Sequence, residues 1–428
     1  MKNRTIRALG ALGFAVAGLC TAQTPPPVQT VPAVPTLETV ELPAPTGPFK
    51  VGTTVWHATD ATRPETFAAA GVQRQVEVMA WYPAAASPGH VEPASYLREG
   101  LAEIPPGLRA AYGSLANVRT HAFLDAPPVA SPEKLPVLVF SHGFGGFPSS
   151  YTALLEDLAS HGYAVLSIIH PYEVTAATLA DGTVVSMFDA AGKPRQPFLD
   201  VIAEWSREDA TMAAVTREAK EDDQLRLLRE YLSGLHATKA TIDRWVKDTQ
   251  LVLDQLAALP KTTAAGRLAA QLDLGRLGAF GHSMGGVVSG EFCLDDKRCR
   301  AGLNLDGIPQ SGTMIDRHLA QPFLMVYSAR PGRTGASDAI YRRAASRYYR
   351  CDVRDTLHLD FSDAVLWGGP FRKNGALGTL PPARAVEITR MIVREYFDQE
   401  LLGRPSAVLA GKTALPEVTV KVFPEASK

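Results

Sequence analysis

The segment from Leu277 to Val288 constrains the fold of this chain more than any other. A short apolar run passes directly into the sequence GHSMGG, from Gly281 to Gly286, and two valines follow it. Small residues two places before and after Ser283 let neighbouring backbone approach closely, and a helix that starts there directs its free N–H groups at the serine. The pattern predicts a strand, a tight turn and a helix, with Ser283 as a nucleophile at the turn. The alternative is a glycine-rich turn whose serine only caps the helix.

Alternating strand and helix signals indicate a mostly parallel sheet. The run Leu135–Ser141 is apolar throughout, as parallel strands are when helices cover both faces. A helical pattern follows to about Ser160 and a second apolar run spans Tyr163–Ile169, which predicts a right-handed crossover between parallel neighbours. Further elements are expected at Gln75–Tyr82, Leu277–Phe280, Ala301–Leu305 and Pro322–Tyr327, with a closing helix at Pro382–Phe397. The predicted class is α/β, with a mostly parallel central sheet flanked by helices.

The stretch from about Asp200 to Leu259 interrupts this alternation. Its apolar residues recur at helical spacing, and it separates two strand signals by far more than one crossover helix needs. We expect a helical insertion at about residues 200–260, lying over the sheet, and a cap over the active site is one interpretation of it. The domain plan is then an α/β domain over residues 49–402 and a C-terminal tail over residues 403–428.

The N-terminus has the layout of a secretory signal peptide. Lys2, Arg4 and Arg7 precede an apolar stretch, and Cys20-Thr-Ala22 follows it, so residues 1–22 are expected to be removed by a cut after Ala22. A lipoprotein anchor at Cys20 and a short buried helix are the alternatives. Residues 23–48 contain eight prolines and no aromatic residue before Phe49, which predicts an extended linker. A secreted or periplasmic protein is expected.

Composition excludes several classes of function. The formal net charge of the 428 residues is -1, which does not favour a nucleic-acid partner, and no apolar run after the signal is long enough for an integral membrane segment. Glycine spacing does not match dinucleotide or phosphate loops, and ligand clusters are not evident, so no cofactor and no metal is expected. Cys293 and Cys299 could form a disulfide in an exported protein, or stay as buried thiols. The oligomeric state is left open.

A nucleophilic serine needs a base, and the base needs a carboxylate. For a serine on such a strand-to-helix turn, the order along the chain is serine, acid, histidine. Only His318 and His358 follow Ser283. His358 lies past the last clear strand and is preferred, whereas His318 lies in a surface turn. Asp306 directly follows the strand Ala301–Leu305 and is the expected acid. The other carboxylates in this part are less suitable: Asp295 and Asp296 lie in a charged turn, Asp316 lies beside His318, and Asp355 is too close to His358.

An acyl-transfer site also needs two N–H donors for the oxyanion. Met284, directly after the nucleophile, supplies one. The second is expected from the loop after the strand Leu135–Ser141, where Gly143-Phe144-Gly145-Gly146 brings backbone to the site, and Phe144 is the predicted donor. His142 and His282 flank these glycines and are expected to orient backbone.

Taken in order, these motifs resemble the plasma and intracellular type II platelet-activating factor acetylhydrolases. The likeness rests on LPVLVFSHGFGGF from Leu135, GHSMGG around Ser283, the step of 23 residues to Asp306, and HLDFSD from His358. It covers roughly residues 49–397 and adjoins the dienelactone hydrolases and bacterial polyester hydrolases. The resemblance implies an α/β-hydrolase fold and a calcium-independent serine esterase with Ser283, Asp306 and His358 as its triad.

The sequence therefore predicts a secreted serine ester hydrolase acting on a small-molecule or lipid ester through an acyl-enzyme. Short-chain acyl esters of phospholipids are the substrates that the resemblance implies. The insertion at 200–260 lies where substrate access is decided, so this preference does not transfer directly. A cutinase-like or dienelactone-hydrolase-like esterase is the alternative within hydrolases, and a non-catalytic binding protein is the alternative of another class.

Overall fold

The computed structural model describes most of the chain downstream of the N-terminal segment. The described residues are 40–85, 93–97, 113–130, 133–189, 191–367, 372, 375–412 and 415–423. The expected signal peptide, its cleavage site and the linker up to residue 39 lie outside the described residues.

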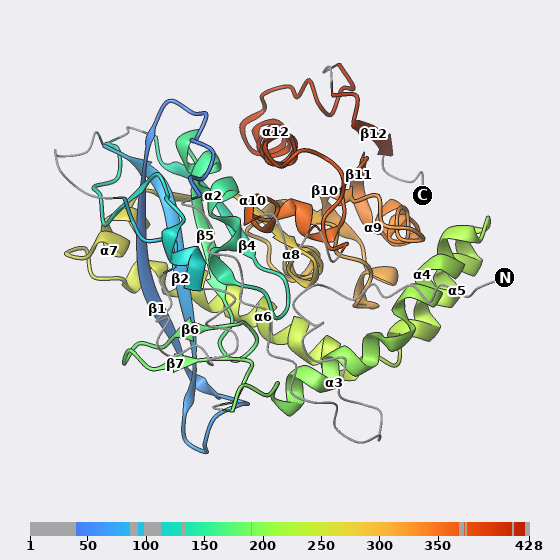
Figure 1. Cartoon of the computed structure of the whole chain (residues 1–428), viewed down its shortest axis with the longest axis horizontal. Coiled ribbons are helices and arrows are strands. Elements are labelled where there is room, and N and C mark those ends of the chain that lie inside the picture. The colour runs from blue at the N-terminus through green and yellow to red at the C-terminus, as the bar shows by residue number, and fades with distance from the viewer. Residues whose placement is uncertain are drawn as a thin grey trace.

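A ten-stranded sheet forms the centre of the molecule (Figure 1). Its order is β12-β11-β10-β9-β8-β4-β5-β2-β1-β3. The middle of the sheet, from β5 to β11, is parallel, whereas β12 and the pairs β1–β2 and β2–β5 are antiparallel. The strands are β1 (Lys50–Pro64), β2 (Gln73–Ala84), β3 (Ala122–Leu124), β4 (Leu135–Ser141), β5 (Ala164–Ile169), β8 (Leu272–His282), β9 (Cys299–Leu305), β10 (Leu319–Tyr327), β11 (Ala345–Val353) and β12 (Val418–Phe423).

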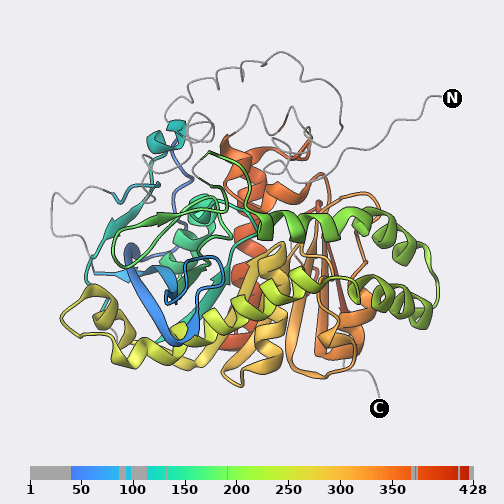
Figure 2. The ribbon, with the colours of Figure 1, turned by 90° about the horizontal axis from the view of Figure 1, so that it is seen from below.

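Helices cover both faces of this sheet, which explains the continuous apolar runs. On β4, Leu138 and Phe140 join one core, and Val137 and Val139 join the other. The first face carries α2 (Thr152–Ser160), α10 (Ala364–Trp367) and α12 (Pro382–Leu402), and the second carries α6 (His236–Gln255), α7 (Ala264–Ala269), α8 (Met284–Asp295) and α9 (Asp338–Ala344). Figures 1 and 2 show α12 and α6 on opposite sides of the strands. This is the expected α/β-hydrolase fold.

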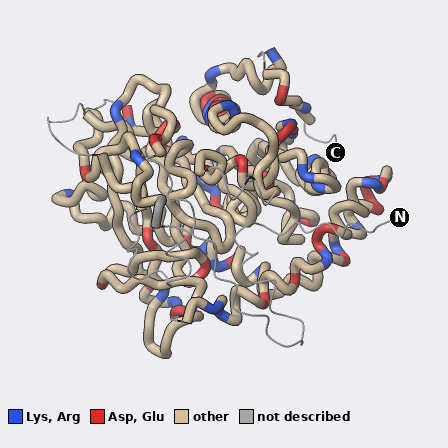
Figure 3. Tube along the Cα trace, in the orientation of Figure 1, with Lys and Arg blue, Asp and Glu red and all other residues tan. Residues whose placement is uncertain are grey.

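Four helices in sequence fill the stretch between β7 (Val184–Val185) and η4 (Leu256–Ala258). We call them the helical insertion; its α-helices are α3 (Gln196–Glu204), α4 (Glu208–Arg217), α5 (Glu221–Leu232) and α6, and the short η3 (Trp205–Arg207) joins α3 to α4. The long helix α6 crosses the sheet and contacts β1, β2 and β5, while α4 and α5 lie at the outer edge, where α5 contacts α9 (Figures 1 and 2). Lys and Arg are intermixed with Asp and Glu along the chain (Figure 3).

The expected domain boundaries need correction at both ends. The tail after residue 402 includes β12, which pairs antiparallel with β11, so it belongs to the domain instead of following it. Without it the N–H and C=O groups along the outer edge of β11 would lack partners. At the other end, Leu42 is buried, and the N–H groups of Thr46 and Gly47 donate to side chains of α2. The expected linker to residue 48 therefore ends before these packed residues.

The cysteines and the helices bear on the cellular setting. Cys293 and Cys299 form a disulfide between the end of α8 and the start of β9, and Cys351 is a buried free thiol on β11. Within the described residues, no helix combines the length and apolar character needed to cross a membrane.

Candidate active site

Ser283 stands between β8 and α8 on a strained turn. Its backbone has φ 58° and ψ -127°, a conformation that non-glycine residues rarely adopt. The flanking glycines make this turn possible. A Cβ atom on Gly281 would overlap the backbone of Gly285, and a Cβ atom on Gly285 would overlap the carbonyl oxygens of Ser141 and His142. The expected strand, turn and helix are present with Ser283 at the turn.

Asp306 and His358 meet beside this turn. Asp306 directly follows β9 at φ 57°, and His358 begins the short helix η6 (His358–Phe361) after β11. Nδ1 of His358 lies 2.7 Å from Oδ2 of Asp306. The N–H of Ser283 donates to the carbonyl of Leu305 at 2.9 Å, so the nucleophile turn and the acid turn are bonded at neighbouring strand ends. We call the carboxyl ends of β8, β9 and β11, together with the side chains of Ser283, Asp306 and His358, the catalytic edge.

The rival residues lie elsewhere. Asp316 is on the surface, where it forms an ion pair with Arg229, and His318 is exposed just before β10. Asp295 pairs with Arg317, also on the surface. The structure therefore pairs Asp306 with His358, bonds the turn of Ser283 to the strand end before Asp306, and leaves these alternatives elsewhere.

Two partners of Asp306 were missed from the sequence. Ser328 donates its N–H at 2.8 Å and its hydroxyl at 3.0 Å to the carboxylate, and Arg330 lies 2.8 Å from Oδ2. Both follow β10, the strand next to β9, so their position directly after an apolar strand was the available signal.

These contacts set the protonation states. Burial alone would raise the pKa of Asp306, but the charge of Arg330 and the bonds from His358 and Ser328 bring it well below its usual value. Burial and the charge of Arg330 lower the pKa of His358, and the Asp306 bond opposes them only in part. His358 is therefore neutral near pH 7 with its proton on Nδ1, because a carboxylate only accepts, and Nε2 can take a proton.

The loop after β4 places the expected oxyanion donors. The carbonyl of Gly143 accepts from the N–H of Gly146 at 3.0 Å and faces Nδ1 of His142 at 2.9 Å. Because the peptide is planar, fixing this carbonyl also fixes the N–H of Phe144 on its opposite side. A Cβ atom on Gly143 would lie 3.5 Å from Cβ of Ser283, so this loop borders the nucleophile. In the described part of the chain, the N–H groups of Phe144 and Met284 donate to no other protein atom.

His142 has the role expected of it, which is to orient backbone. Its Nε2 accepts from the N–H of His170 at 3.3 Å, so Nδ1 carries the proton that goes to the Gly143 carbonyl. Burial and the nearby His170 lower the pKa of His142 to about 3, which keeps the ring neutral. The loop therefore keeps one arrangement of hydrogen bonds across the neutral range.

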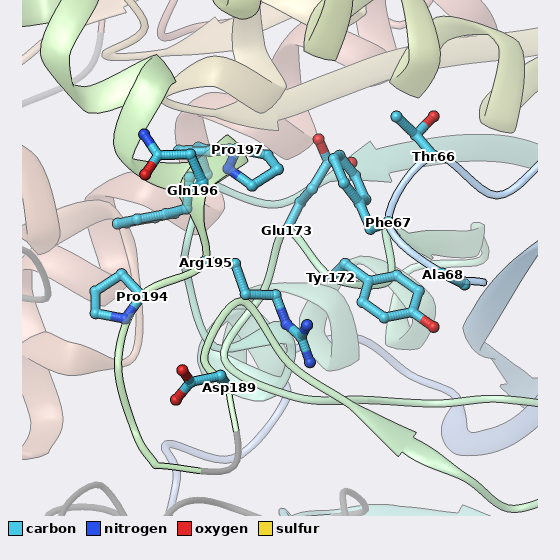
Figure 4. Close-up of a pocket in the computed structure, with 12 residues that line it drawn as sticks. Thr66, Phe67, Ala68, Tyr172, Glu173, Asp189, Pro194, Arg195, Gln196 and Pro197 are labelled. Carbon is cyan, nitrogen blue, oxygen red and sulfur yellow. The ribbon is translucent and has the colours of Figure 1, made fainter.

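Phe144 lines a cavity of about 500 Å³, and Figure 4 shows this cavity with ten of its lining residues labelled. The ring of Phe144 stacks on Phe198 with centroids 5.1 Å apart, and Phe67 and Tyr172 add two further aromatic groups to the lining. Arg195 extends its guanidinium among the labelled residues, next to the ring of Tyr172 (Figure 4). Ser283, Asp306 and His358 are not among the residues that line this cavity, whereas Phe144, next to Gly143 in the loop that borders Ser283, is.

The sequence matches a known protein family. The pattern described as "Platelet-activating factor acetylhydrolase, isoform II" matches residues 35–333, a range that includes Ser283 and Asp306 but ends before His358.

Individual relatives are similar at lower identity. A platelet-activating factor acetylhydrolase of Canis lupus familiaris is 26% identical over 251 residues, covering 56% of this chain and 51% of the relative. That of Cavia porcellus is 28% identical over 202 residues, covering 47% and 42%. The chain thus spans about half the length of these relatives. A "probable 1-alkyl-2-acetylglycerophosphocholine esterase" of Arthroderma benhamiae is 22% identical over 414 residues, covering 88% and 92%.

A solved structure resembles the whole fold. It is the ferulic acid esterase from Streptomyces cinnamoneus, with a TM-score of 0.68 and 28% sequence identity. The likeness covers 90% of this chain and 99% of that one.

Proposed function

Because the chain belongs to the platelet-activating factor acetylhydrolase isoform II family, we propose that it is a serine carboxylic-ester hydrolase with Ser283 as nucleophile. The observation that carries the proposal is the bond of 2.7 Å between His358 and Asp306, beside a serine at φ 58°. A protein that only binds ligands has no need of a base paired with an acid beside a strained nucleophile turn. The esterase activities in the names of the relatives support the same reaction class.

The proposed reaction proceeds in two acyl-transfer steps. The hydroxyl oxygen of Ser283 attacks the ester carbonyl carbon while Nε2 of His358 takes its proton. The N–H groups of Phe144 and Met284 stabilise the negative oxygen, and Asp306 stabilises the imidazolium. The tetrahedral intermediate then collapses, and the alcohol leaves with the proton from His358. Water attacks the acyl-enzyme by the same route, releasing the acid and restoring Ser283.

The substrate proposal is a short-chain acyl ester, with acyl esters of phospholipids as the first candidates. It is supported by the names of the relatives and by a bounded cavity next to the expected oxyanion donor. The aromatic lining also suits the aromatic acyl group implied by the name of the ferulic acid esterase. A panel containing a 2-acetyl phospholipid, methyl ferulate, a polyester film and p-nitrophenyl butyrate separates these substrates. The highest kcat/KM is expected for the acetyl phospholipid.

We also propose that the protein is exported. The charged and apolar layout of residues 1–22 supports this, and so does the Cys293–Cys299 disulfide, which is typical of oxidising compartments. N-terminal sequencing of protein recovered from the culture medium or periplasm should begin at Gln23. A start at a lipid-modified Cys20 would support the lipoprotein alternative.

Turnover of p-nitrophenyl acetate or butyrate tests the activity directly. The wild-type chain should hydrolyse both, and Ser283→Ala should reduce kcat by about 10⁴-fold or more. Ser233→Ala is the matched control, since Ser233 is an exposed serine in the insertion. An inactive folded wild type, or a Ser283→Ala variant that keeps most of its activity, would contradict the proposal.

A further inference from the structure

Four groups form an unbroken chain of hydrogen bonds behind the catalytic edge. The N–H of Gly143 donates to the hydroxyl of Tyr151 at 3.1 Å. That hydroxyl lies 3.0 Å from Nδ1 of His282, and Nε2 of His282 lies 2.8 Å from the backbone carbonyl of His358. The side chains of Tyr151 and His282 are buried, so water does not compete for these bonds.

The chemistry of the two ends fixes the direction of every bond. A carbonyl can only accept, so Nε2 of His282 must carry the proton. Nδ1 then holds a lone pair and accepts from the hydroxyl of Tyr151, whose oxygen accepts from Gly143. Burial and the neighbouring His358 keep the pKa of His282 well below its usual value, and burial raises that of Tyr151. Both groups stay neutral, and the chain of bonds has one arrangement of protons.

The two ends of this chain of hydrogen bonds belong to two parts of the site whose relative position the proposed reaction depends on. Gly143 immediately precedes Phe144, whose N–H is the expected oxyanion donor. His358 is the expected base, and its carbonyl is held from the same imidazole that directly precedes Ser283. The rings of His282 and His358 lie 4.5 Å apart, which leaves little room for independent displacement.

We infer that Tyr151 and His282 are positioning residues. They couple the oxyanion loop, which is the loop after β4 that carries Gly143 and Phe144, to the backbone of the expected base His358. The inference rests on the proposed ester hydrolysis. Both side chains are buried and do not line the cavity, so loss of the coupling should lower kcat with little change in KM. Misplacing reacting groups by about 1 Å can cost about 10²-fold in rate, which sets the scale of the effect.

Paired substitutions separate positioning from general structural damage. His282→Met removes both bonds, whereas His282→Gln has similar length and can still donate to the carbonyl of His358. Tyr151→Phe keeps the ring and removes only the hydroxyl. Its matched control is Tyr163→Phe, since Tyr163 is also buried and donates to Asp398 at 2.8 Å, away from the site.

We expect His282→Met to lower kcat for p-nitrophenyl butyrate by about 10- to 100-fold, and His282→Gln to recover a large part of the loss. Tyr151→Phe should lose about tenfold and Tyr163→Phe almost nothing, and the loss in the Tyr151→Phe/His282→Met double variant should be smaller than the product of the two. Wild-type kcat in the single variants, equal loss in the Met and Gln variants, or equal loss in both tyrosine variants would overturn the inference. If the His282 variants do not fold, the tyrosine pair decides.

The histidine tautomer gives a readout that does not depend on activity. Imidazole ¹⁵N shifts of the wild-type protein should show His282 neutral with its proton on Nε2, and Tyr151→Phe should perturb its Nδ1 signal. A proton on Nδ1 would overturn the inference even in an active enzyme. Conversely, an inactive wild type with the expected tautomer would refute the proposed function, and the positioning role with it, while confirming the arrangement of hydrogen bonds.

Discussion

The catalytic edge and the helical insertion are held by different kinds of contact. On the edge, Ser283 and Asp306 stand at positive φ on turns directly after β8 and β9, and backbone bonds between strand ends keep them in place. In the insertion, position depends on buried side chains that meet partners far away in the sequence. Arg74 on β2 and Asp248 on α6 are both almost fully buried and lie 2.6 Å apart. The nucleophile and the acid are therefore held by turns and backbone bonds at strand ends, whereas the insertion is held by buried side chains that pair across the fold.

The insertion also touches the loops that border the site. Trp245 on α6 stacks on His170 with ring centroids 4.0 Å apart and donates from Nε1 to Glu173 at 2.8 Å. His170 faces Asp248 at 2.9 Å and donates its N–H to His142. The insertion thus supports the loop after β4 through His170, although it contributes none of the three proposed triad residues.

The largest expected effect is a loss of activity on the catalytic edge. Asp306→Asn should lower kcat for p-nitrophenyl acetate by about 10³- to 10⁴-fold, because an amide does not fix the tautomer of His358. Asp316→Asn is the matched control, since Asp316 is an exposed carboxylate paired with Arg229. Comparable loss in the two variants would refute the assignment of the acid.

The next effect concerns the insertion, and it is a loss of stability. Arg74→Met leaves the buried carboxylate of Asp248 without its closest cation, and removing one partner of such a pair typically costs about 3–5 kcal/mol. Urea unfolding should show a loss of this order. Arg226→Met, which removes an exposed pair with Asp223, should cost less than about 1 kcal/mol. Equal costs would remove the distinction between the two regions.

The smallest effect is a shift in the pH dependence of activity at the catalytic edge. The acid limb of kcat/KM should follow protonation of His358, whose pKa is lowered below 6.5, so activity should persist below that pH and fall as pH drops further. Arg330→Gln removes a charge that lowers this pKa, so the limb should move to higher pH. Arg317→Gln, on the surface, should leave the limb in place. A limb that stays or moves down in Arg330→Gln would contradict the electrostatic account.

The same division explains what could be predicted from the sequence. β4 was predicted at its exact bounds because its seven residues are all buried, and the nucleophile turn because its glycines are sterically required. The candidate acid, base and oxyanion donors followed from strand ends and chain order. Arg330 was missed because it acts through Asp306, 24 residues earlier in the sequence. β12 was missed because its partner strand β11 lies more than 60 residues upstream.

The cavity could not be predicted from the sequence. Its lining comes from the segment after β1, the loops after β4 and β5, and the start of α3, which no local pattern relates to one another. The shape of the cavity depends on how the insertion packs, and this packing depends on buried contacts such as that of Arg74 with Asp248.

Covalent labelling tests the central claim, that Ser283 is an activated nucleophile on the catalytic edge. A fluorophosphonate should add once per chain, and peptide mass spectrometry should place the adduct on Ser283. The rate of labelling should fall strongly in His358→Gln, which removes the base. No adduct on the folded wild-type protein, an adduct at another serine, or an unchanged rate in His358→Gln would contradict the account.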